Sequence, residues 1–262
     1  MKDLFSLEGK VSVVTGGNGG IGKGIADGLA MKGSAVVVAA RDLKKTTEAV
    51  EDLKQRFGVK ATGLALDVAN HESIKKGIQQ VLDEYGRIDV LVNNAGVNIR
   101  KKPQLYAPEE WDIILDTNLK GAFLCCQAVY PAMKAQGKGK IINTGSMTSL
   151  LGLGGGLPYG CSKMGILSMT YSLALAWARD NIYVNCILPG WIDTALTVQA
   201  RRDFPGLSDF VEDRTPQGRW GKPEDFMGAA AFLASDASDF VTGEYLRVDG
   251  GFAQHGNMVS FK

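Results

Sequence analysis

Two kinds of hydrophobic pattern alternate along this chain. Short runs rich in valine and isoleucine are separated by longer stretches in which apolar residues recur every three or four positions. The short runs are typical of buried strands, because they are too brief for helices and are rich in β-branched residues. They predict strands at residues 11–14, 35–39, 62–66, 90–93, 140–144, 183–188 and 245–248.

The longer stretches have the periodicity of amphipathic helices. Apolar stripes of this kind are formed by Leu43, Val50, Leu53 and Phe57, and again by Ile74, Ile78, Val81 and Leu82. Further helices are predicted after the first strand and within residues 108–136 and 159–178. Such alternation is typical of a parallel sheet covered on both faces. Because no repeat or Pro- or Ser-rich linker interrupts it, we expect one doubly wound α/β domain over residues 1–262.

Composition and charge are those of an ordinary globular chain. Of its 262 residues, 45% are hydrophobic and 22% are charged, which allows a large buried core. The net charge is +1 and no basic stripe stands out, so no nucleic acid or anionic membrane is expected as the main partner. The start of the chain lacks the core of a signal peptide, and no apolar run approaches the roughly 20 residues of a membrane span. We therefore expect a cytoplasmic protein that binds a small molecule.

The cysteines and histidines do not have the spacing of metal ligands. They are Cys125, Cys126, Cys161, Cys186, His71 and His255. No two cysteines form a CxxC pair, and the two histidines lie far apart in the sequence. We expect reduced thiols and no metal site built by the protein.

A glycine-rich run follows the first predicted strand. Residues 15–22 read TGGNGGIG, and Ile21, Ile25 and Leu29 then mark one face of a helix. A strand, a glycine turn and a helix N-terminus together direct backbone N–H groups and the positive end of a helix dipole at a phosphate group. Glycine also permits the close approach that this requires. The run therefore predicts a Rossmann-type nucleotide site near the start of the chain.

A serine, a tyrosine and a lysine form a second group after the fifth predicted strand. Ser146 is followed by Tyr159 and Lys163, which stand one helical turn apart. Side chains at positions i and i+4 share one face of a helix, so the lysine ammonium group can lie near the tyrosine phenol. A nearby cation favours phenolate, and lowering a pKa near 10 by about three units takes roughly 4 kcal/mol. A tyrosine tuned in this way can exchange protons, and the serine can hydrogen-bond the reacting oxygen.

These motifs resemble, in their order and spacing, those of the short-chain dehydrogenase/reductase family, over nearly all of the chain. The matching segments are TGxxxGIG at 15–22, NNAG at 93–96, the serine at 146, YxxxK at 159–163 and PG at 189–190. The resemblance implies an oxidoreductase in which the nicotinamide of a bound cofactor carries the hydride. It also implies a homotetramer, assembled through the two long helices and the segment 241–251.

The resemblance further implies roles for individual residues. Tyr159 would be the general acid/base, Ser146 would orient the substrate oxygen, and Lys163 would tune the tyrosine and bind the ribose. Asn118 would hold a water that connects the lysine to solvent, although a buried asparagine can also simply satisfy backbone groups. The implied cofactor-binding positions are Gly16, Asn18, Gly20, Ile21, Gly22, Asp67, Val68, Asn94, Ala95, Gly96, Tyr159, Lys163, Pro189, Gly190, Ile192 and Thr194.

The choice between NAD and NADP depends on the end of the second predicted strand. An NAD site usually has an acidic residue there, which hydrogen-bonds the ribose. This chain has Ala40 and then Arg41, whose guanidinium suits a 2′-phosphate, so the sequence favours NADP(H). Asp42 keeps NAD(H) open as the alternative, should its carboxylate face the ribose.

The substrate is indicated only by the loops around residues 97–108, 150–158 and 190–215. Arg100, in a basic stretch after the NNAG segment, is a candidate for a carboxylate or phosphate group, and Trp191 offers an apolar wall. Together with Ser146 and Tyr159 these are the candidate substrate contacts. Residues 98–112 and 190–197 resemble those of sugar and sugar-acid dehydrogenases of the gluconate dehydrogenase type. That resemblance predicts a sugar acid, a polyol or a related hydroxy compound as substrate.

Two other functions remain open at this point. A 3-oxoacyl-thioester reductase would have the same fold and catalytic residues, because one such fold serves many substrates. A noncatalytic NADP(H)-binding sensor or scaffold would keep the glycine turn, but it would have no need of a tyrosine and a lysine one helical turn apart.

Overall fold

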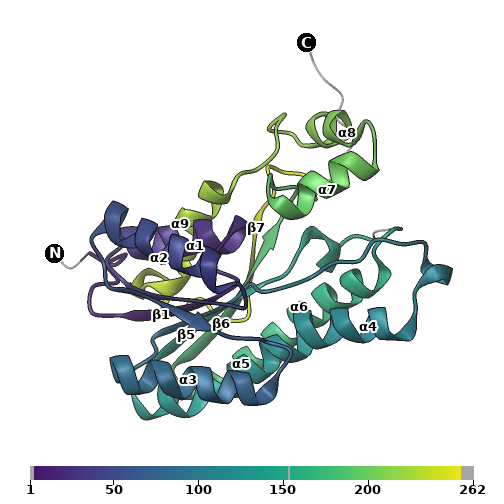
Figure 1. The fold of residues 1–262 in the computed structure, drawn as a ribbon. Helices are drawn as coiled ribbons and strands as arrows, with labels where there is room; N and C mark the ends of the chain where they lie inside the picture. Colours follow the sequence, from purple (N-terminus) through teal and green to yellow (C-terminus); the bar gives the residue numbers. More distant parts are fainter. Residues whose placement is uncertain (1–2, 153, 255–262) are drawn as a thin grey trace.

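A single parallel sheet with helices on both faces forms the body of the molecule (Figure 1). The computed structural model describes residues 3–152 and 154–254, so position 153 and residues 255–262, with His255, lie outside it. The seven strands have the order β3-β2-β1-β4-β5-β6-β7, and every neighbouring pair is parallel. The predicted doubly wound α/β fold is confirmed.

Each strand lies within one residue of a predicted run. The strands are β1 Val11–Thr15, β2 Ala35–Ala40, β3 Ala61–Ala65, β4 Val90–Asn93, β5 Gly139–Thr144, β6 Ile182–Pro189 and β7 Tyr245–Val248. The central strands β1, β4 and β5 are buried along their whole length. Burial on both faces explains why these strands have continuous apolar runs instead of an alternating pattern.

The helices that connect the strands cover the two faces of the sheet. They are α1 Gly20–Met31, α2 Leu43–Phe57, α3 His71–Tyr85, α4 Pro108–Leu115, α5 Gly121–Ala135, α6 Leu157–Trp177, α7 Ala195–Asp203, α8 Leu207–Arg214 and α9 Met227–Ala234. Figure 1 shows α1, α2 and α9 on one side of the sheet and α3, α5 and α6 on the other. Helices α7 and α8 stand apart from these layers.

Each face of the sheet has its own apolar core. Alternate residues of β1 belong to different cores, since Val14 packs with α1 and α9 whereas Val13 packs with α3 and α5. The stripe of Cys125, Val129 and Met133 on α5 is fully buried in the second core. Its residues therefore stabilise the domain interior.

The segment between β4 and β5 contains an irregular turn. Residues 108–136, predicted to be helical, form α4 and α5 joined by a π-helical turn at Asp116–Lys120, which buries Asn118. Such π turns inside a helix are often found at functional sites. In this chain the turn lies beside the loop that follows β4, because Asn118 hydrogen-bonds Val97.

Residues 190–215, expected to be a loop, contain α7 and α8. The two helices have only nine and eight residues, and α8 buries little more than Val211. Helices this short have too few turns for a clear apolar stripe. We also note that none of the helices in the described segments combines the length and apolarity needed to cross a bilayer.

Candidate active site

A cavity of about 1120 Å³ lies at the carboxyl ends of the strands. The sheet order changes direction between β1 and β4, and ligands of doubly wound sheets bind at such a point. Segments far apart in the sequence meet there: the glycine turn, the ends of β2, β4, β5 and β6, the start of α6, and α7 and α8. The two groups of residues that the sequence singles out therefore share one cavity.

The glycine turn has the conformation that a phosphate cradle requires. Gly16 and Gly20 have φ of +65° and +52°, a region that other residues rarely adopt. Both glycines line the cavity with Asn18 and Ile21. Gly22 does not line it; a Cβ there would lie 2.2 Å from the Gly16 carbonyl oxygen. The sequence predicted Gly22 as a cofactor contact. In the structure it instead allows α1 to pack closely against the turn.

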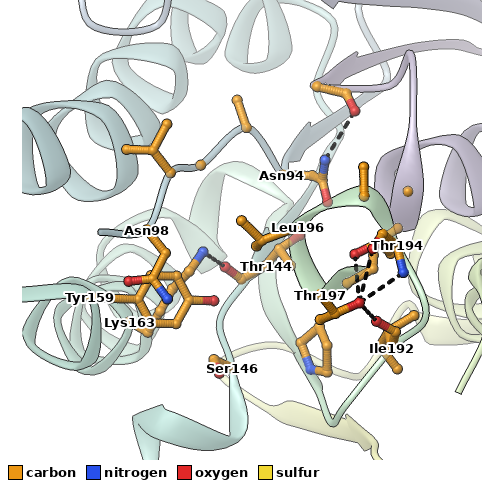
Figure 2. Close-up of a pocket in the computed structure, with 18 of the residues that line it drawn as sticks. Asn94, Asn98, Thr144, Ser146, Tyr159, Lys163, Ile192, Thr194, Leu196 and Thr197 are labelled. Atoms are coloured by element: carbon orange, nitrogen blue, oxygen red, sulfur yellow. Dashed lines mark hydrogen bonds between the residues drawn. The ribbon is translucent and has the colours of Figure 1, made fainter. Parts of the chain in front are cut away.

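A threonine and an asparagine join the glycine turn to the end of β4. Thr15 Oγ1 accepts hydrogen bonds from the backbone N–H groups of Asn94 and Ala95, at 3.0 and 3.1 Å. The Asn94 side chain donates back to the carbonyl oxygens of Thr15 and Gly16. Figure 2 shows Asn94 at this junction. The cavity is lined by three predicted cofactor positions, Asn94, Ala95 and Gly96. The hydrogen bonds of the Thr15 and Asn94 side chains hold this segment at the glycine turn.

Two cationic residues line the cavity just beyond β2, one directly after the strand and one in the first turn of α2. Arg41 is one of them, and Lys45, which the sequence analysis did not single out, is the other. Asp42 caps α2, where its side chain accepts a hydrogen bond from the Lys45 backbone N–H at 3.1 Å. Its carboxylate also lies 3.7 Å from the Lys45 ammonium group. Asp42, the acidic residue that left NAD open, also lines the cavity, where its carboxylate is engaged in capping and in an ion pair.

The remaining predicted cofactor positions line two further walls. Asp67 and Val68 follow β3, and the Asp67 carboxylate accepts the backbone N–H of Ala69 at 3.0 Å. After β6 the lining residues include Pro189, Gly190, Ile192 and Thr194. Their backbone is held by one side chain, as Figure 2 shows: Thr197 Oγ1 donates to the Ile192 carbonyl at 2.6 Å and accepts from the Thr194 N–H at 3.0 Å.

Ser146, Tyr159 and Lys163 line the same cavity. The Lys163 ammonium group donates to the Thr144 carbonyl oxygen at 2.7 Å and lies 5.6 Å from the centre of the Tyr159 ring. Figure 2 shows the tyrosine and lysine together, with Thr144 beside the lysine. Ser146 Oγ accepts the Thr148 backbone N–H at 3.1 Å, so its own proton is left for another acceptor.

Burial dominates the ionisation of both groups on α6. It raises the pKa of Tyr159, while the Ser146 hydroxyl and the Arg100 charge lower it. Burial also lowers the pKa of Lys163 to about 8. The expected lowering of the Tyr159 pKa by Lys163 stays a prediction, because the net shift is upward and burial is its largest cause. The cost of removing the phenolate from water exceeds the effect of the neighbouring groups.

Asn118 lies behind the cavity wall. Its amide exchanges two hydrogen bonds with the backbone of Val97, at 2.8 and 2.9 Å, and donates a third to Ser162 Oγ at 3.1 Å. These bonds hold the loop after β4 against α6. The side chain is thus satisfied by protein groups, which is the alternative that the sequence analysis left open.

Of the basic residues in the loop after β4, Arg100 lines the cavity. The neighbouring Lys101 forms an ion pair with Glu110 instead. Trp191 also lines the cavity, and its ring packs edge-on against Trp220 with the centroids 5.7 Å apart. Arg100 and Trp191, the two predicted substrate contacts outside the catalytic group, are therefore both placed where a ligand would meet them.

A further wall is formed by α7, α8 and the chain after β7; its first two parts lie within the predicted substrate segment 190–215, but its individual side chains were not singled out. Its lining residues are Leu196, Phe204, Leu207, Phe210, Arg214 and Phe252. In the sequence only the four-residue spacing of Phe210 and Arg214 hints at a shared helix face. Among the residues that the structure places, no group of three or more His, Cys, Asp or Glu side chains has the geometry of a metal site.

Comparison with known proteins identifies the family. A family model described as enoyl-(acyl carrier protein) reductase matches residues 16–253. The chain is 42% identical over 251 residues to 2-dehydro-3-deoxy-D-gluconate 5-dehydrogenase of Escherichia coli K12, covering 95% of this chain and 97% of the relative. It belongs to the short-chain dehydrogenase/reductase family. As a member of that family, the chain is an oxidoreductase.

Two further relatives of this short-chain dehydrogenase/reductase are informative. The 5-keto-D-gluconate 5-reductase of E. coli K12 is 38% identical over 251 residues, covering 96% of this chain and 98% of the relative. A crystal structure of a gluconate 5-dehydrogenase from Burkholderia cenocepacia, in complex with NADP and tartrate, superposes with a TM-score of 0.92. It is 38% identical and covers 97% of this chain and 99% of that one.

Proposed function

We propose that this protein transfers a hydride between NADP(H) and a secondary alcohol or ketone of a sugar acid or related hydroxy compound. The observation that carries this proposal is that the glycine turn and the residues Ser146, Tyr159 and Lys163 line one cavity. A dinucleotide held by the turn would reach toward the proton-transferring group, as a hydride transfer requires. The relatives named as gluconate dehydrogenases support the choice of substrate class.

The residues around the cavity fit a bound NADP. Backbone groups of Gly16, Asn18, Gly20 and Ile21 would hold the pyrophosphate at the N-terminus of α1. Arg41 and Lys45 would hold the 2′-phosphate, because both are cationic and Asp42 is engaged in its helix cap. Asp67 and Val68 would meet adenine, and the segments 94–96 and 189–194 would enclose the nicotinamide and its ribose. When bound, NADPH supplies the hydride and NADP accepts it.

Each catalytic side chain would have its own role in the transfer of the proton. Tyr159 would give its phenolic proton to the substrate oxygen in reduction and take it back in oxidation, while Ser146 Oγ would donate a hydrogen bond to the same oxygen. The environment that raises the pKa of Tyr159 keeps the phenol protonated, as the proton donor must be. Lys163 has one of its three donors on Thr144, which leaves two for the ribose hydroxyls and a water. Asn118 would position the backbone around that water.

Unpaired polar atoms in the cavity support a polyhydroxy substrate. Asn98 Oδ1 and Thr148 Oγ1 are buried and make no hydrogen bond within the described residues, although both side chains line the cavity. Buried polar groups are normally paired, so these atoms point to a ligand that carries hydroxyl groups. Arg100 adds a positive charge for an acid. Residues 97–108, 150–158 and 190–215 would supply the substrate contacts.

We also propose a homotetramer in the cytoplasm. Large apolar side chains remain exposed on α4, α5 and α6, a pattern that favours burial against another copy. They are Trp111, Ile113, Phe123, Met164, Tyr171 and Leu175. The four cysteines are free thiols, as expected in a reducing compartment. Light scattering on the purified protein tests the assembly, and a monomer would contradict it.

A substrate panel tests the proposed activity. Purified protein is assayed by nicotinamide absorbance with NADPH and NADH against 5-keto-D-gluconate, neutral ketoses and 3-oxoacyl thioesters, and in reverse against gluconate and polyols. We expect turnover of the sugar acids with NADPH preferred. Turnover confined to thioesters would overturn the substrate class in favour of a 3-oxoacyl-thioester reductase. Cofactor binding without turnover of any compound would favour a noncatalytic sensor.

A further inference from the structure

Arg214 occupies an unusual position in the cavity. It is the last residue of α8, and its guanidinium lies over two aromatic rings, 4.9 Å from the centre of Phe252 and 5.8 Å from that of Phe210. All three side chains line the cavity. The Nε atom of Arg214 is buried and makes no hydrogen bond in the described part of the chain. A charged donor is thus held among aromatic rings with that N–H unused.

Three other arginines of this protein, two of them exposed and one half-buried, have acidic partners. Arg87 pairs with Asp89 at 2.6 Å, Arg219 with Asp225 at 2.7 Å, and Arg201 with Asp193. Within residues 3–152 and 154–254, no carboxylate forms an ion pair with Arg214. A buried polar group without a partner is costly, and this cost is greatest for a charged group. The arrangement is therefore suited to an anion that enters with a ligand.

The cofactor phosphates have other partners in the proposed binding mode. Arg41 follows β2 and Lys45 lies in the first turn of α2, and the pyrophosphate belongs at the glycine turn. Arg214 comes instead from α8, in the wall that follows β6, where Phe204 and Leu207 also line the cavity. This wall would face substrate, since the segments for each part of the cofactor lie elsewhere.

We propose that Arg214 binds the carboxylate of the acidic substrate. This inference rests on the proposed function and names the group that would select acids over neutral polyols. A planar guanidinium can bind a carboxylate through two parallel hydrogen bonds, and its packing on Phe210 and Phe252 fixes the plane of the fork. Of the two rings Phe252 is buried, and it shields one side of the guanidinium from water, which strengthens an ion pair there.

A sugar acid carries its reacting carbon and its carboxylate at different points of one chain. In a 5-ketogluconate the reacting carbon is four bonds from the carboxylate carbon, about 5 Å in an extended chain. Arg100 and Tyr159 both line the cavity, and the charge of Arg100 lowers the pKa of the phenol, so we assign Arg100 to the reacting end. Arg214 on α8 then meets the other end of the chain. Arg100 and Arg214 would thus have different tasks, one near the reacting oxygen and one at the carboxylate.

Calorimetry with gluconate and the NADPH-loaded protein tests this assignment. We expect Arg214→Gln to weaken gluconate binding about 10- to 100-fold, the effect of losing a hydrogen-bonded charge pair. Arg214→Lys keeps the charge and should retain a large part of the affinity. Arg202→Gln is the matched control, because Arg202 lies on neighbouring α7, is exposed and does not line the cavity. NADPH affinity, measured by fluorescence, should be unchanged in all three variants.

Several outcomes would overturn the assignment. They are gluconate affinity in Arg214→Gln within twofold of the unmodified protein, a parallel loss of NADPH affinity, or an equal loss in Arg202→Gln. In steady-state assays the expected change is a higher KM for 5-keto-D-gluconate, with kcat and the KM for neutral ketoses kept within a few fold. An unmodified protein that turns over no acid with either cofactor would contradict the proposed function instead, before any variant is compared.

Discussion

The ammonium group of Lys163 is fixed by the backbone of Thr144, to which it donates a hydrogen bond of 2.7 Å. Thr144 ends β5, so the central sheet itself sets the position of the lysine. Lys163 is 4% exposed, and the centre of the Tyr159 ring lies 5.6 Å from its nitrogen. The strand therefore holds the lysine in place. Two of its three N–H donors are left to bind the ribose and a water.

The first prediction concerns the phenolic proton of Tyr159. Tyr159→Phe removes the proton donor and should lower kcat about 10²- to 10⁴-fold, the usual contribution of general acid–base catalysis. NADPH affinity, measured by fluorescence titration, should stay within twofold. Tyr171→Phe, on the same helix but exposed and away from the cavity, is the control and should keep full activity. A Tyr159→Phe enzyme with more than a tenth of the original rate would rule out this role.

The second prediction concerns cofactor preference. Replacing both Arg41 and Lys45 by glutamine removes the two cationic groups that line the cavity between β2 and the first turn of α2. Because each hydrogen bond to a charged group contributes about 1.5–3 kcal/mol, kcat/KM for NADPH should fall about 100-fold or more. The value for NADH should change little. Lys44→Gln, at an exposed neighbouring residue that does not line the cavity, should leave both values unchanged. Equal losses with both cofactors would show that these residues do not read the 2′-phosphate.

The third prediction is a shift in pH dependence. Oxidation requires deprotonated Tyr159, so the oxidation rate should rise with pH. The positive charge of Arg100 lowers the pKa of Tyr159, so Arg100→Gln should raise that pKa. The rising limb of the oxidation profile then moves to higher pH, and reduction persists to higher pH as well. Lys101→Gln is the control, because Lys101 pairs with Glu110 outside the cavity. A limb that stays in place, or moves to lower pH, in Arg100→Gln would refute the electrostatic coupling.

The fourth prediction concerns the packing of α1 against the glycine turn. Gly22→Ala places a Cβ 2.2 Å from the Gly16 carbonyl oxygen, so the helix must shift. We expect a loss of about 1–3 kcal/mol in unfolding free energy, with weaker NADPH binding. In α9, by contrast, a Cβ on Gly228 meets open space, and Gly228→Ala should stabilise the protein by about 0.5–1 kcal/mol. Thermal unfolding distinguishes the two, and an unaffected Gly22→Ala would contradict the packing role.

Much of the fold could be predicted from the sequence. The central strands β1, β4 and β5 are buried on both faces, so each appears as a compact apolar run with little ambiguity in its ends. Tight glycine turns also have a local signature, and the predicted turn contains Gly16 and Gly20, whose φ angles are positive. The short helices α7 and α8 could not be predicted in this way. Their few buried residues, Ala200 and Val211 among them, give no sustained period.

The candidate site could be predicted only in outline. Spacing placed Tyr159 and Lys163 together, but it contains no information about desolvation, which decides the direction of the tyrosine pKa shift. Similarly, Lys45 and Arg214 look like ordinary surface cations in the sequence. Only the folded chain shows that one lies beside Arg41 at the cavity and that the other is set among aromatic rings.

The most direct test of the central claim follows the hydride itself. The protein is incubated with 5-keto-D-gluconate and NADPH deuterated at both C4 positions of the nicotinamide, and the product is analysed by mass spectrometry and NMR. A transfer of hydride from the cofactor predicts gluconate-type product with one deuterium bound to the carbon that was the ketone. Product without deuterium at that carbon, or no product while NADPH remains bound, would contradict the account.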